Sequence, residues 1–326
     1  MIDQKLQMER YIRGKTYTDE DDKNVREILM FLEERKAGTA TEKRISQSAL
    51  ARIARVGVST LSQILTGGYP GSPTKMLTQV MSAVRANQQE SSNIIPMVET
   101  SVFKVVITAC RMARRNRNFS LISAFVGTGK TSALKHYAKE NSNVFLIEAR
   151  PMMTPQRLVK EIAKKVFGVH VKGSVDDLID RIVDELKNTD SLIIFDEAET
   201  VTDSLLHLLR RFRDLMNIGV VISGTEYLND KIKPTGGEFD QIRSRVGFWP
   251  PIAHGITKDD ATALLAAGFP DEDLSEDFIE RCYKYSQGSA RMLVENLLVN
   301  IQTYRKDHPL SVELVDTVAT KVLFLK

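Results

Sequence analysis

The sequence has few of the features that mark metal-binding or membrane proteins. It contains only two cysteines, Cys110 and Cys282, among 326 residues. Because they are isolated and lack the spacing of a metal site, we interpret them as small buried side chains in a reducing compartment. No hydrophobic run approaches the length of a membrane-spanning helix, and residues 1–15 lack the apolar core of a signal peptide. We therefore expect a cytoplasmic protein with no membrane partner.

The sequence also lacks a strong charge of either sign. Lys and Arg together number 45 and Asp and Glu 42, so the net charge is +3. This surplus is too small to indicate a polyanionic partner, and any nucleic-acid surface must come from local clustering of charge. Hydrophobic residues make up 42% and charged residues 27%, as in ordinary globular proteins. The length allows two or three domains.

The spacing of apolar residues changes along the chain and predicts three regions. Residues 1–92 have apolar positions at helical spacing and end in a polar stretch, residues 87–93, which we interpret as a linker. In residues 93–256, apolar β-type runs alternate with helical stretches, which predicts a parallel sheet covered by helices. Residues 257–326 are again helical in pattern. The four β-type runs are residues 121–126, 143–148, 191–196 and 218–223.

The most specific motif follows the first of these runs, in the segment SLISAFVGTGKT. A strand, a glycine-containing loop and a helix form a phosphate loop, in which backbone N–H groups surround a phosphate at a helix N-terminus. Lys130 would reach the β- and γ-phosphates of ATP, and the Thr131 hydroxyl would bind Mg²⁺. The pattern has glycine where this chain has Ala124, but the phosphate-contacting residues are intact, so we expect binding to survive. The predicted nucleotide-binding residues are Val126, Gly127, Thr128, Gly129, Lys130, Thr131 and Ser132.

Three further segments supply candidate catalytic residues. The run SLIIFDEAET ends in Asp196 and Glu197, where a phosphate-loop ATPase places an acid for the Mg²⁺ shell and a Glu for the attacking water. Thr225 follows the run IGVVISGT and could sense the γ-phosphate, although a polar turn after a strand has the same pattern. Arg291 lies early in a predicted helix after Gly288. It could reach the phosphates or be an ordinary surface arginine.

Together these motifs resemble the AAA+ ATPases over roughly residues 94–326. The resemblance implies an α/β core, a helical lid from about Thr257, and ATP bound between them. In that family an arginine of one subunit completes the ATP site of its neighbour. The segment DQIRSRVGFW lies where this arginine is expected, and Arg245 is the first candidate and Arg243 the second. A solvent-exposed basic turn is the alternative.

Several stretches are similar to the bacteriophage Mu B transposition protein family, in the same order along the chain. They are PMVET, NVFLIEARP, LIIFDEAETV, NIGVVISGT, TGGEFDQIRSRV and GSARML. The resemblance implies an AAA+ ATPase behind a helix-turn-helix domain, which binds double-stranded DNA as an ATP-dependent helical oligomer and activates a transposase. It also implies a phage- or mobile-element-encoded protein in a bacterial host. The sequence departs from the family at Ala124, usually Gly, and at Thr225, usually Asn.

The N-terminal region carries a helix-turn-helix pattern in the segment QSALARIARVGVSTLSQIL. Arg55 occupies the position at which the pattern usually has the turn glycine, while Gly57 comes two residues later. The register of the turn is therefore open. A recognition helix starting near Ser59 would present short polar side chains suited to phosphates and weak base contacts. A helical domain for protein contacts is the alternative. The predicted DNA-contacting residues are Thr60, Ser62 and Gln63, and the packing positions are Gln47, Ala51, Val56, Leu61 and Ile64.

Three basic clusters of the ATPase region are candidates for a second DNA surface. Charge runs on helices are usually solvated faces, but in related ATPases the segment after the second strand lies on the DNA-facing side. From this segment we predict DNA contacts by Arg150, Thr154, Gln156, Arg157 and Lys160. The competing clusters are Arg111, Arg114, Arg115 and Arg117, and Arg210, Arg211 and Arg213.

The sequence thus predicts an ATPase that uses ATP and Mg²⁺ to assemble on target DNA and to activate or direct a transposase. Two alternatives remain at this point. One is a helicase loader or replication initiator of the same ATPase superfamily, and the other is a helix-turn-helix transcription regulator switched by its ATPase. The short polar recognition helix argues mildly against the regulator, because a repressor needs strong base contacts.

Overall fold

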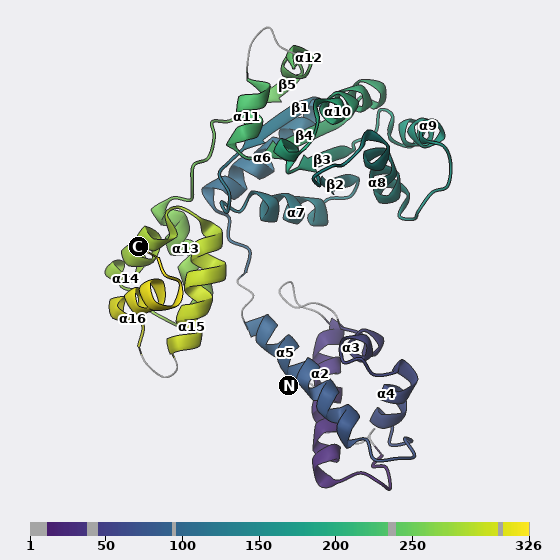
Figure 1. Ribbon diagram of the computed structural model, residues 1–326, viewed down its shortest axis with the longest axis vertical. Coiled ribbons are helices and arrows are strands. Elements are labelled where there is room, and N and C mark those ends of the chain that lie inside the picture. The colour runs from purple at the N-terminus through teal and green to yellow at the C-terminus, as the bar shows by residue number, and fades with distance from the viewer. Residues whose placement is uncertain (1–11, 38–44, 93–95, 234–238, 306–308, 326) are drawn as a thin grey trace. The chain divides into compact units, whose positions relative to one another are not determined.

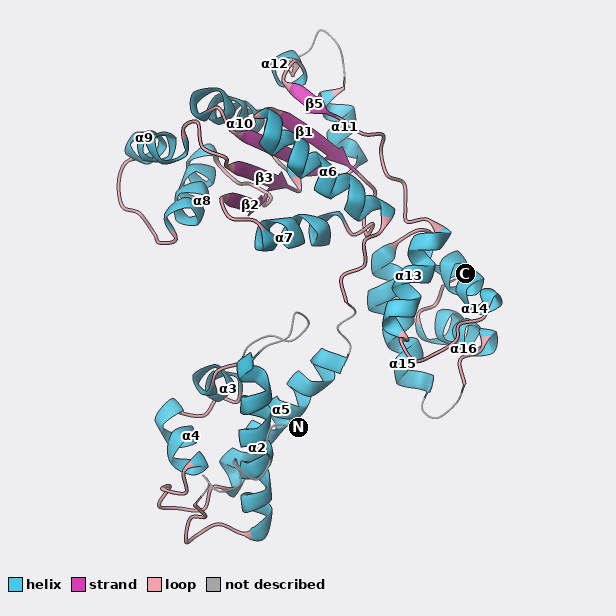
Figure 2. Cartoon of the chain, turned by 180° about the vertical axis from the view of Figure 1, so that it is seen from behind, coloured by secondary structure: helices cyan, strands magenta, loops and turns pink. Residues whose placement is uncertain are grey.

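The structure is a computed structural model of the chain that describes residues 12–37, 45–92, 96–233, 239–305 and 309–325. The chain forms two compact units, Met1–Pro96 and Met97–Lys326 (Figures 1 and 2). None of the described helices is long and apolar enough to cross a membrane.

The described part of the first unit is helical. Four acidic residues in the first turn of α2 suit the positive end of the helix dipole, and the Ser46 hydroxyl caps α3 by accepting from the Ala49 N–H. Buried side chains from all four helices, including Val25, Leu50 and Leu77, form one core. The helices are α2 (Asp19–Ala37), α3 (Gln47–Ile53), α4 (Val58–Leu65) and α5 (Thr74–Ser92).

The predicted linker is part of a helix. Because α5 runs to Ser92, the prediction of a linker was wrong for residues 87–92, and Asn93 lies outside the described residues. The stretch is rich in Gln and Glu, which have good helix propensity. Polarity without apolar periodicity therefore did not distinguish a loop from the last turns of a helix.

The second unit contains a five-stranded sheet in the order β2-β3-β4-β1-β5. Every neighbouring pair is parallel, so the carboxyl ends of the strands lie at one edge. β4 lies between β1 and β3, which brings the ends of these three strands together. The strands are β1 (Phe119–Ser123), β2 (Val144–Glu148), β3 (Leu192–Asp196), β4 (Gly219–Gly224) and β5 (Val246–Phe248).

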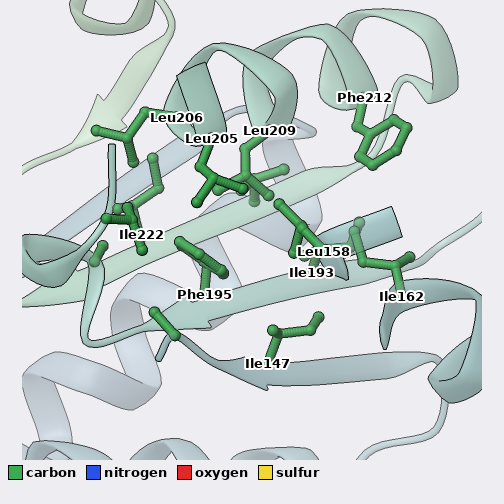
Figure 3. Close-up of a cluster of buried hydrophobic side chains, with 14 of the residues drawn as sticks. Ile147, Leu158, Ile162, Ile193, Phe195, Leu205, Leu206, Leu209, Phe212 and Ile222 are labelled. Atoms are coloured by element: carbon green, nitrogen blue, oxygen red, sulfur yellow. The ribbon is translucent and has the colours of Figure 1, made fainter. Parts of the chain in front are cut away.

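Helices cover both faces of this sheet (Figure 2). Alternation along a strand sends Ile122 and Ile194 toward α6 and α7, and Leu121 and Ile193 toward the opposite face. Figure 3 shows the second core, where the sheet meets Leu158 of α8 and Leu209 of α10. The predicted α/β core is confirmed. The helices are α6 (Ser101–Asn116), α7 (Lys130–Glu140), α8 (Pro155–Phe167), α9 (Val175–Leu186) and α10 (Asp203–Met216).

The C-terminal part of this unit is a helical lid with its own buried residues, among them Leu265, Phe278 and Leu297. Its elements are α13 (Lys258–Gly268), α14 (Glu276–Ser286), the π-helix η2 (Met292–Leu298), α15 (Val299–Arg305), α16 (Val312–Thr317) and the π-helix η3 (Val318–Val322). Three short elements lie within the core: the 3₁₀ helix η1 (Ala198–Thr200) follows β3, and α11 (Glu226–Ile232) and α12 (Asp240–Arg243) lie between β4 and β5.

Candidate functional site

The loop between β1 and α7 has the backbone of a phosphate loop. Gly127 and Gly129 have φ values of 80° and 93°, which glycine adopts without strain. Gly127 also lies against the lid, because a Cβ there would be 2.4 Å from Ser289 Oγ. Gly129 precedes Lys130, the first residue of α7, so the loop ends at a helix N-terminus, where free N–H groups favour an anion.

Ala124 fits the first position of this loop. It is buried, and it is not among the described residues with positive φ. Its N–H donates to the Gly224 carbonyl at 3.2 Å, which holds the end of β1 against the end of β4. The conformation therefore does not require glycine at this position, and the departure from the usual motif leaves the loop intact.

The side chains of α7 and β3 meet beside the loop. The Thr131 hydroxyl donates to Asp196 Oδ2 at 2.7 Å, and Lys130 Nζ donates to the Ala124 carbonyl at 3.4 Å. Asp196 is buried, and its Oδ1 has no hydrogen-bond partner among the described residues. A buried carboxylate oxygen without a partner is costly, and a hydroxyl and a carboxylate are ligands that Mg²⁺ accepts. These groups fit the predicted cation.

Glu197 follows Asp196 but is exposed and has a left-handed backbone, with φ of 58°. Its pKa is raised above the usual range, first by partial burial and then by the neighbouring charges of Asp196 and Glu199. A carboxylate with a raised pKa is a better proton acceptor than an ordinary one. Its place beside the loop suits the water-activating role predicted for it.

Thr225 lies at the same edge of the sheet, directly after β4. It is buried, and within the described ranges its hydroxyl has no hydrogen-bond partner. Because β4 neighbours both β1 and β3, Thr225 shares this edge with the phosphate loop and with Asp196. An unused buried hydroxyl there suits a γ-phosphate contact, although the assignment stays a prediction.

Arg291 connects the lid to the loop through its backbone. Its N–H donates to the Gly127 carbonyl at 2.9 Å, which fixes the start of η2 beside the phosphate loop. Its side chain is 58% exposed and pairs with Glu295 at 3.8 Å. The backbone contact was not foreseen from the sequence, because it joins segments that are far apart in the chain.

A second contact between lid and core involves Asp260 and Ser101. Asp260 closes a capping box with Thr257 at the start of α13, and its carboxylate also accepts from Ser101 at the start of α6. The residues TKDD could have indicated the capping box. No pattern in the sequence indicated Ser101 as the partner.

Arg243 and Arg245 lie near the amino ends of the parallel strands, whereas the phosphate loop lies at their carboxyl ends. Arg245 precedes β5, and its carbonyl accepts from the N–H of Phe119, the first residue of β1. Its guanidinium pairs with Asp214 at 2.8 Å, while Arg243 pairs with Asp240 at 3.2 Å. Either arginine could therefore reach a phosphate only in another subunit, as the prediction requires.

The five residues predicted to contact DNA around α8 are exposed. Thr154 caps α8 by accepting from the Arg157 N–H at 3.2 Å, while Leu158 and Ile162 are buried in the core on the opposite side. No ion pair within the described ranges involves the cations of this surface. The exposed residues are Arg150, Thr154, Gln156, Arg157 and Lys160.

Several arginines of the two competing basic clusters are engaged in internal contacts, while Arg111, Arg115 and Arg211 are exposed. Arg114 pairs with Asp190 at 2.9 Å, and Arg213 donates to the Arg117 carbonyl at 2.7 Å. Arg210 pairs with Asp214 at 3.5 Å. Arginines held in such contacts are less available to a ligand, and in the α8 surface none of the three cations Arg150, Arg157 and Lys160 is held in this way among the described residues.

The structure settles the register of the helix-turn-helix. Arg55 has φ of 56°, and the Val56 N–H donates to the Ala51 carbonyl at 2.9 Å. The left-handed residue of the turn is therefore Arg55, as the pattern places it, while Gly57 caps α4 in an extended conformation. Leu61 and Ile64 are buried in the core. On the other side of α4, Ser62 and Gln63 are exposed and Thr60 is half-buried.

Comparison with known proteins agrees with this geometry. Residues 113–232 match the family model described as an AAA domain. Over 219 residues the chain is 26% identical to the Mu-like prophage FluMu DNA transposition protein B of Haemophilus influenzae, covering 63% of this chain and 74% of that protein. It is 27% identical over 159 residues to the ATP-dependent target DNA activator B of Escherichia phage Mu, covering 46% of this chain.

The chain resembles transposition proteins of the Mu B family.

The match to the phage Mu protein spans 49% of that protein's length. A RuvB variant from Thermotoga maritima is 16% identical, with a TM-score of 0.46 and coverage of 68% of each chain. The predicted Mu B resemblance is confirmed, and so is the prediction of an ATPase with an AAA+ core. The chain has the phosphate-loop residues Lys130 and Thr131 and the acidic strand end at Asp196.

Proposed function

We propose that the chain is an ATP-dependent DNA-binding protein that assembles on double-stranded target DNA and activates or directs a transposase. Two relatives are named for DNA transposition and for ATP-dependent activation of target DNA. The observation that carries the proposal lies at the phosphate loop. There, Thr131 donates to Asp196 at 2.7 Å beside a carboxylate oxygen that has no partner among the described residues.

The nucleotide site would bind ATP through residues of α7 and β3. Mg²⁺ held by Thr131 and Asp196 would neutralise charge on the phosphates. Lys130 would exchange its contact with the Ala124 carbonyl for the β- and γ-phosphates, since an ammonium binds phosphate far better than a neutral carbonyl. The loop N–H groups would orient the remaining phosphate oxygens.

Hydrolysis would use Glu197 and Thr225. Glu197 would accept a proton from the attacking water, and its raised pKa favours that role. Thr225 would position the γ-phosphate or the water with its buried hydroxyl. Arg291 and, from a neighbouring subunit, Arg245 would stabilise the negative charge that develops on the phosphates.

DNA would contact both units. The exposed cations on and before α8 carry no ion pair among the described residues and would bind phosphates of the backbone. The exposed polar side chains of α4 would add weaker contacts. Because the arginine that completes each ATP site would come from a neighbour, ATP would favour a helical oligomer, and hydrolysis would favour its disassembly.

Electron microscopy of the full chain with ATP and random-sequence duplex DNA tests this proposal. Continuous filaments are expected with ATP, and none with Lys130→Ala. Titrations on unrelated duplexes should show an affinity that falls steeply with salt and varies little with sequence. A helicase loader or initiator would instead form discrete rings. A regulator would prefer one site over random DNA by about 10³ or more.

A further inference from the structure

An unusual turn precedes the basic helix α8. The Met153 N–H donates to the Arg150 carbonyl at 3.0 Å, which closes a four-residue turn with Met152 in third position. Met152 has φ of 63°. Pro151 fixes its own φ at about −65°, so the positive φ falls on the third residue and the turn is type II.

The third position of a type II turn strongly favours glycine or asparagine. Other non-glycine residues with positive φ, such as Arg117, Asn217 and Gln287, end helices, where this conformation is common. Met152 does not end a helix. It therefore holds a backbone conformation that its side chain disfavours, without the usual structural reason.

The Met152 side chain also contributes no packing. It is 94% exposed, whereas the next residue, Met153, is 5% exposed and belongs to the core under the sheet. Exposed apolar residues are common, but this one combines nearly full exposure with an unfavourable backbone. Strain that the fold does not need is frequently associated with a functional role.

The turn is held from both sides. Ala149 is buried in the core before the tip, and Met153 is buried in the core after it, where the Thr154 hydroxyl caps α8. The tip is therefore presented from a fixed base. Exposed cations lie near it in the chain, Arg150 before the tip and Arg157 and Lys160 on α8.

We propose that Met152 inserts into the stack of bases of DNA held by the cations around it. An apolar side chain that projects from a basic surface is the arrangement by which proteins partially unstack a base step. The flanking cations select a polyanion over an apolar protein pocket, which would leave them desolvated and unpaired. The inference rests on the proposed binding of DNA to the α8 surface.

Duplexes with a fluorescent adenine analogue at several positions report unstacking as a rise in emission. The full chain with ATP should raise the emission at saturation. Met152→Gly and Met152→Gln should bind DNA with an unchanged slope of log affinity against log salt, yet lose most of this rise. Met152→Gly should also raise the melting temperature of the protein, because glycine accepts the positive φ, so a loss of signal cannot be attributed to misfolding.

Lys160→Ala is the matched control. It should reduce the salt slope by about 0.9 for one lost phosphate contact, while keeping the emission per bound protein at saturation. Binding without a rise in emission, or a full rise with Met152→Gly, overturns the inference and leaves the proposed function standing. Failure of the unmodified chain to bind any duplex overturns both. Loss of transposase activation by Met152→Gln with unchanged unstacking would identify a protein contact and also overturn the inference.

Discussion

Asp260 of the lid holds Ser101 of the ATPase core by two hydrogen bonds to one carboxylate. The Ser101 N–H donates to Oδ1 at 2.7 Å, and the Ser101 hydroxyl donates to Oδ2 at 2.5 Å. Burial by itself would raise the pKa of Asp260, but the hydrogen bonds from Ser101 and Thr257 outweigh it and hold the pKa below its usual value. The charged carboxylate thus joins α13 to α6.

Asp260→Asn should destabilise the second unit, because a hydrogen bond to a charged group contributes about 1.5–3 kcal/mol. The pKa is lowered in the folded state, so this stability is present above the pKa of the unfolded chain and is lost as the pH falls through the folded pKa. Denaturant unfolding of the full chain across acid pH measures this. Asp259→Asn, in the same helical turn, is the control and should change stability little. Equal loss in both variants would show that the helix dipole, not Ser101, accounts for the effect.

Lys130→Ala should abolish ATP binding and, with it, assembly on DNA, while the fold survives. The ammonium is the one side-chain cation that the loop offers to the β- and γ-phosphates. Binding of a fluorescent ATP analogue and DNA retention with ATP measure the two effects. Lys135→Ala, on the same helix but paired with Glu148 at the surface, should behave like the unmodified chain. Unchanged ATP-dependent DNA affinity of Lys130→Ala would refute the coupling between the two sites.

The two neighbouring acids should differ in role. Asp196→Asn should weaken nucleotide binding, because it removes charge from the group that accepts from Thr131. Glu197→Gln should bind ATP normally and hydrolyse it slowly. If hydrolysis dissolves the oligomer, Glu197→Gln assemblies should persist on DNA after free ATP is washed away, while unmodified assemblies decay. Parallel time courses of dissociation and phosphate release test this. Equal decay despite blocked hydrolysis would leave ATP as a structural ligand only.

Removal of residues 1–92 should leave ATP binding intact and weaken DNA affinity. The truncation removes the helix-turn-helix with its exposed Ser62 and Gln63 but leaves the second unit, Met97–Lys326, whole. Nucleotide titration and DNA titration of the truncated chain measure the two properties. A folded truncated protein that does not bind ATP would contradict this division of roles.

Arg55→Gly should stabilise the N-terminal unit by about 1 kcal/mol, because a left-handed backbone costs an L-residue about this much and glycine almost nothing. Arg52→Gly is the control and should have the opposite effect on stability. Arg52 lies in the last turn of α3, where glycine is unfavourable by about 1 kcal/mol. Hydrogen exchange of the α3 amides in the full chain reports both changes. Destabilisation by Arg55→Gly would mean that the Arg55 side chain, not its backbone, matters to the turn.

The nucleotide loop was predictable from sequence because its parts are neighbours in the chain. A buried strand, two glycines, Lys130 and Thr131 fall within a few residues, and a helix N-terminus binds anions wherever it occurs. The AAA+ core could be predicted for the same reason, since apolar runs and helical periods are local patterns. The error at residues 87–92 shows the limit, because a solvated helix end and a loop have similar composition.

The tertiary structure decided which distant residues meet. Thr131 bonds to Asp196 only because the sheet order places β3 two positions from β1, with β4 between them. Ser101 meets Asp260, and Gly127 meets Arg291, because the lid packs against the core. Such contacts depend on how whole helices and strands pack, and no local spacing of residues in the sequence indicates them. The sequence by itself therefore determined the motifs and their chemistry, and the folded chain determined their partners.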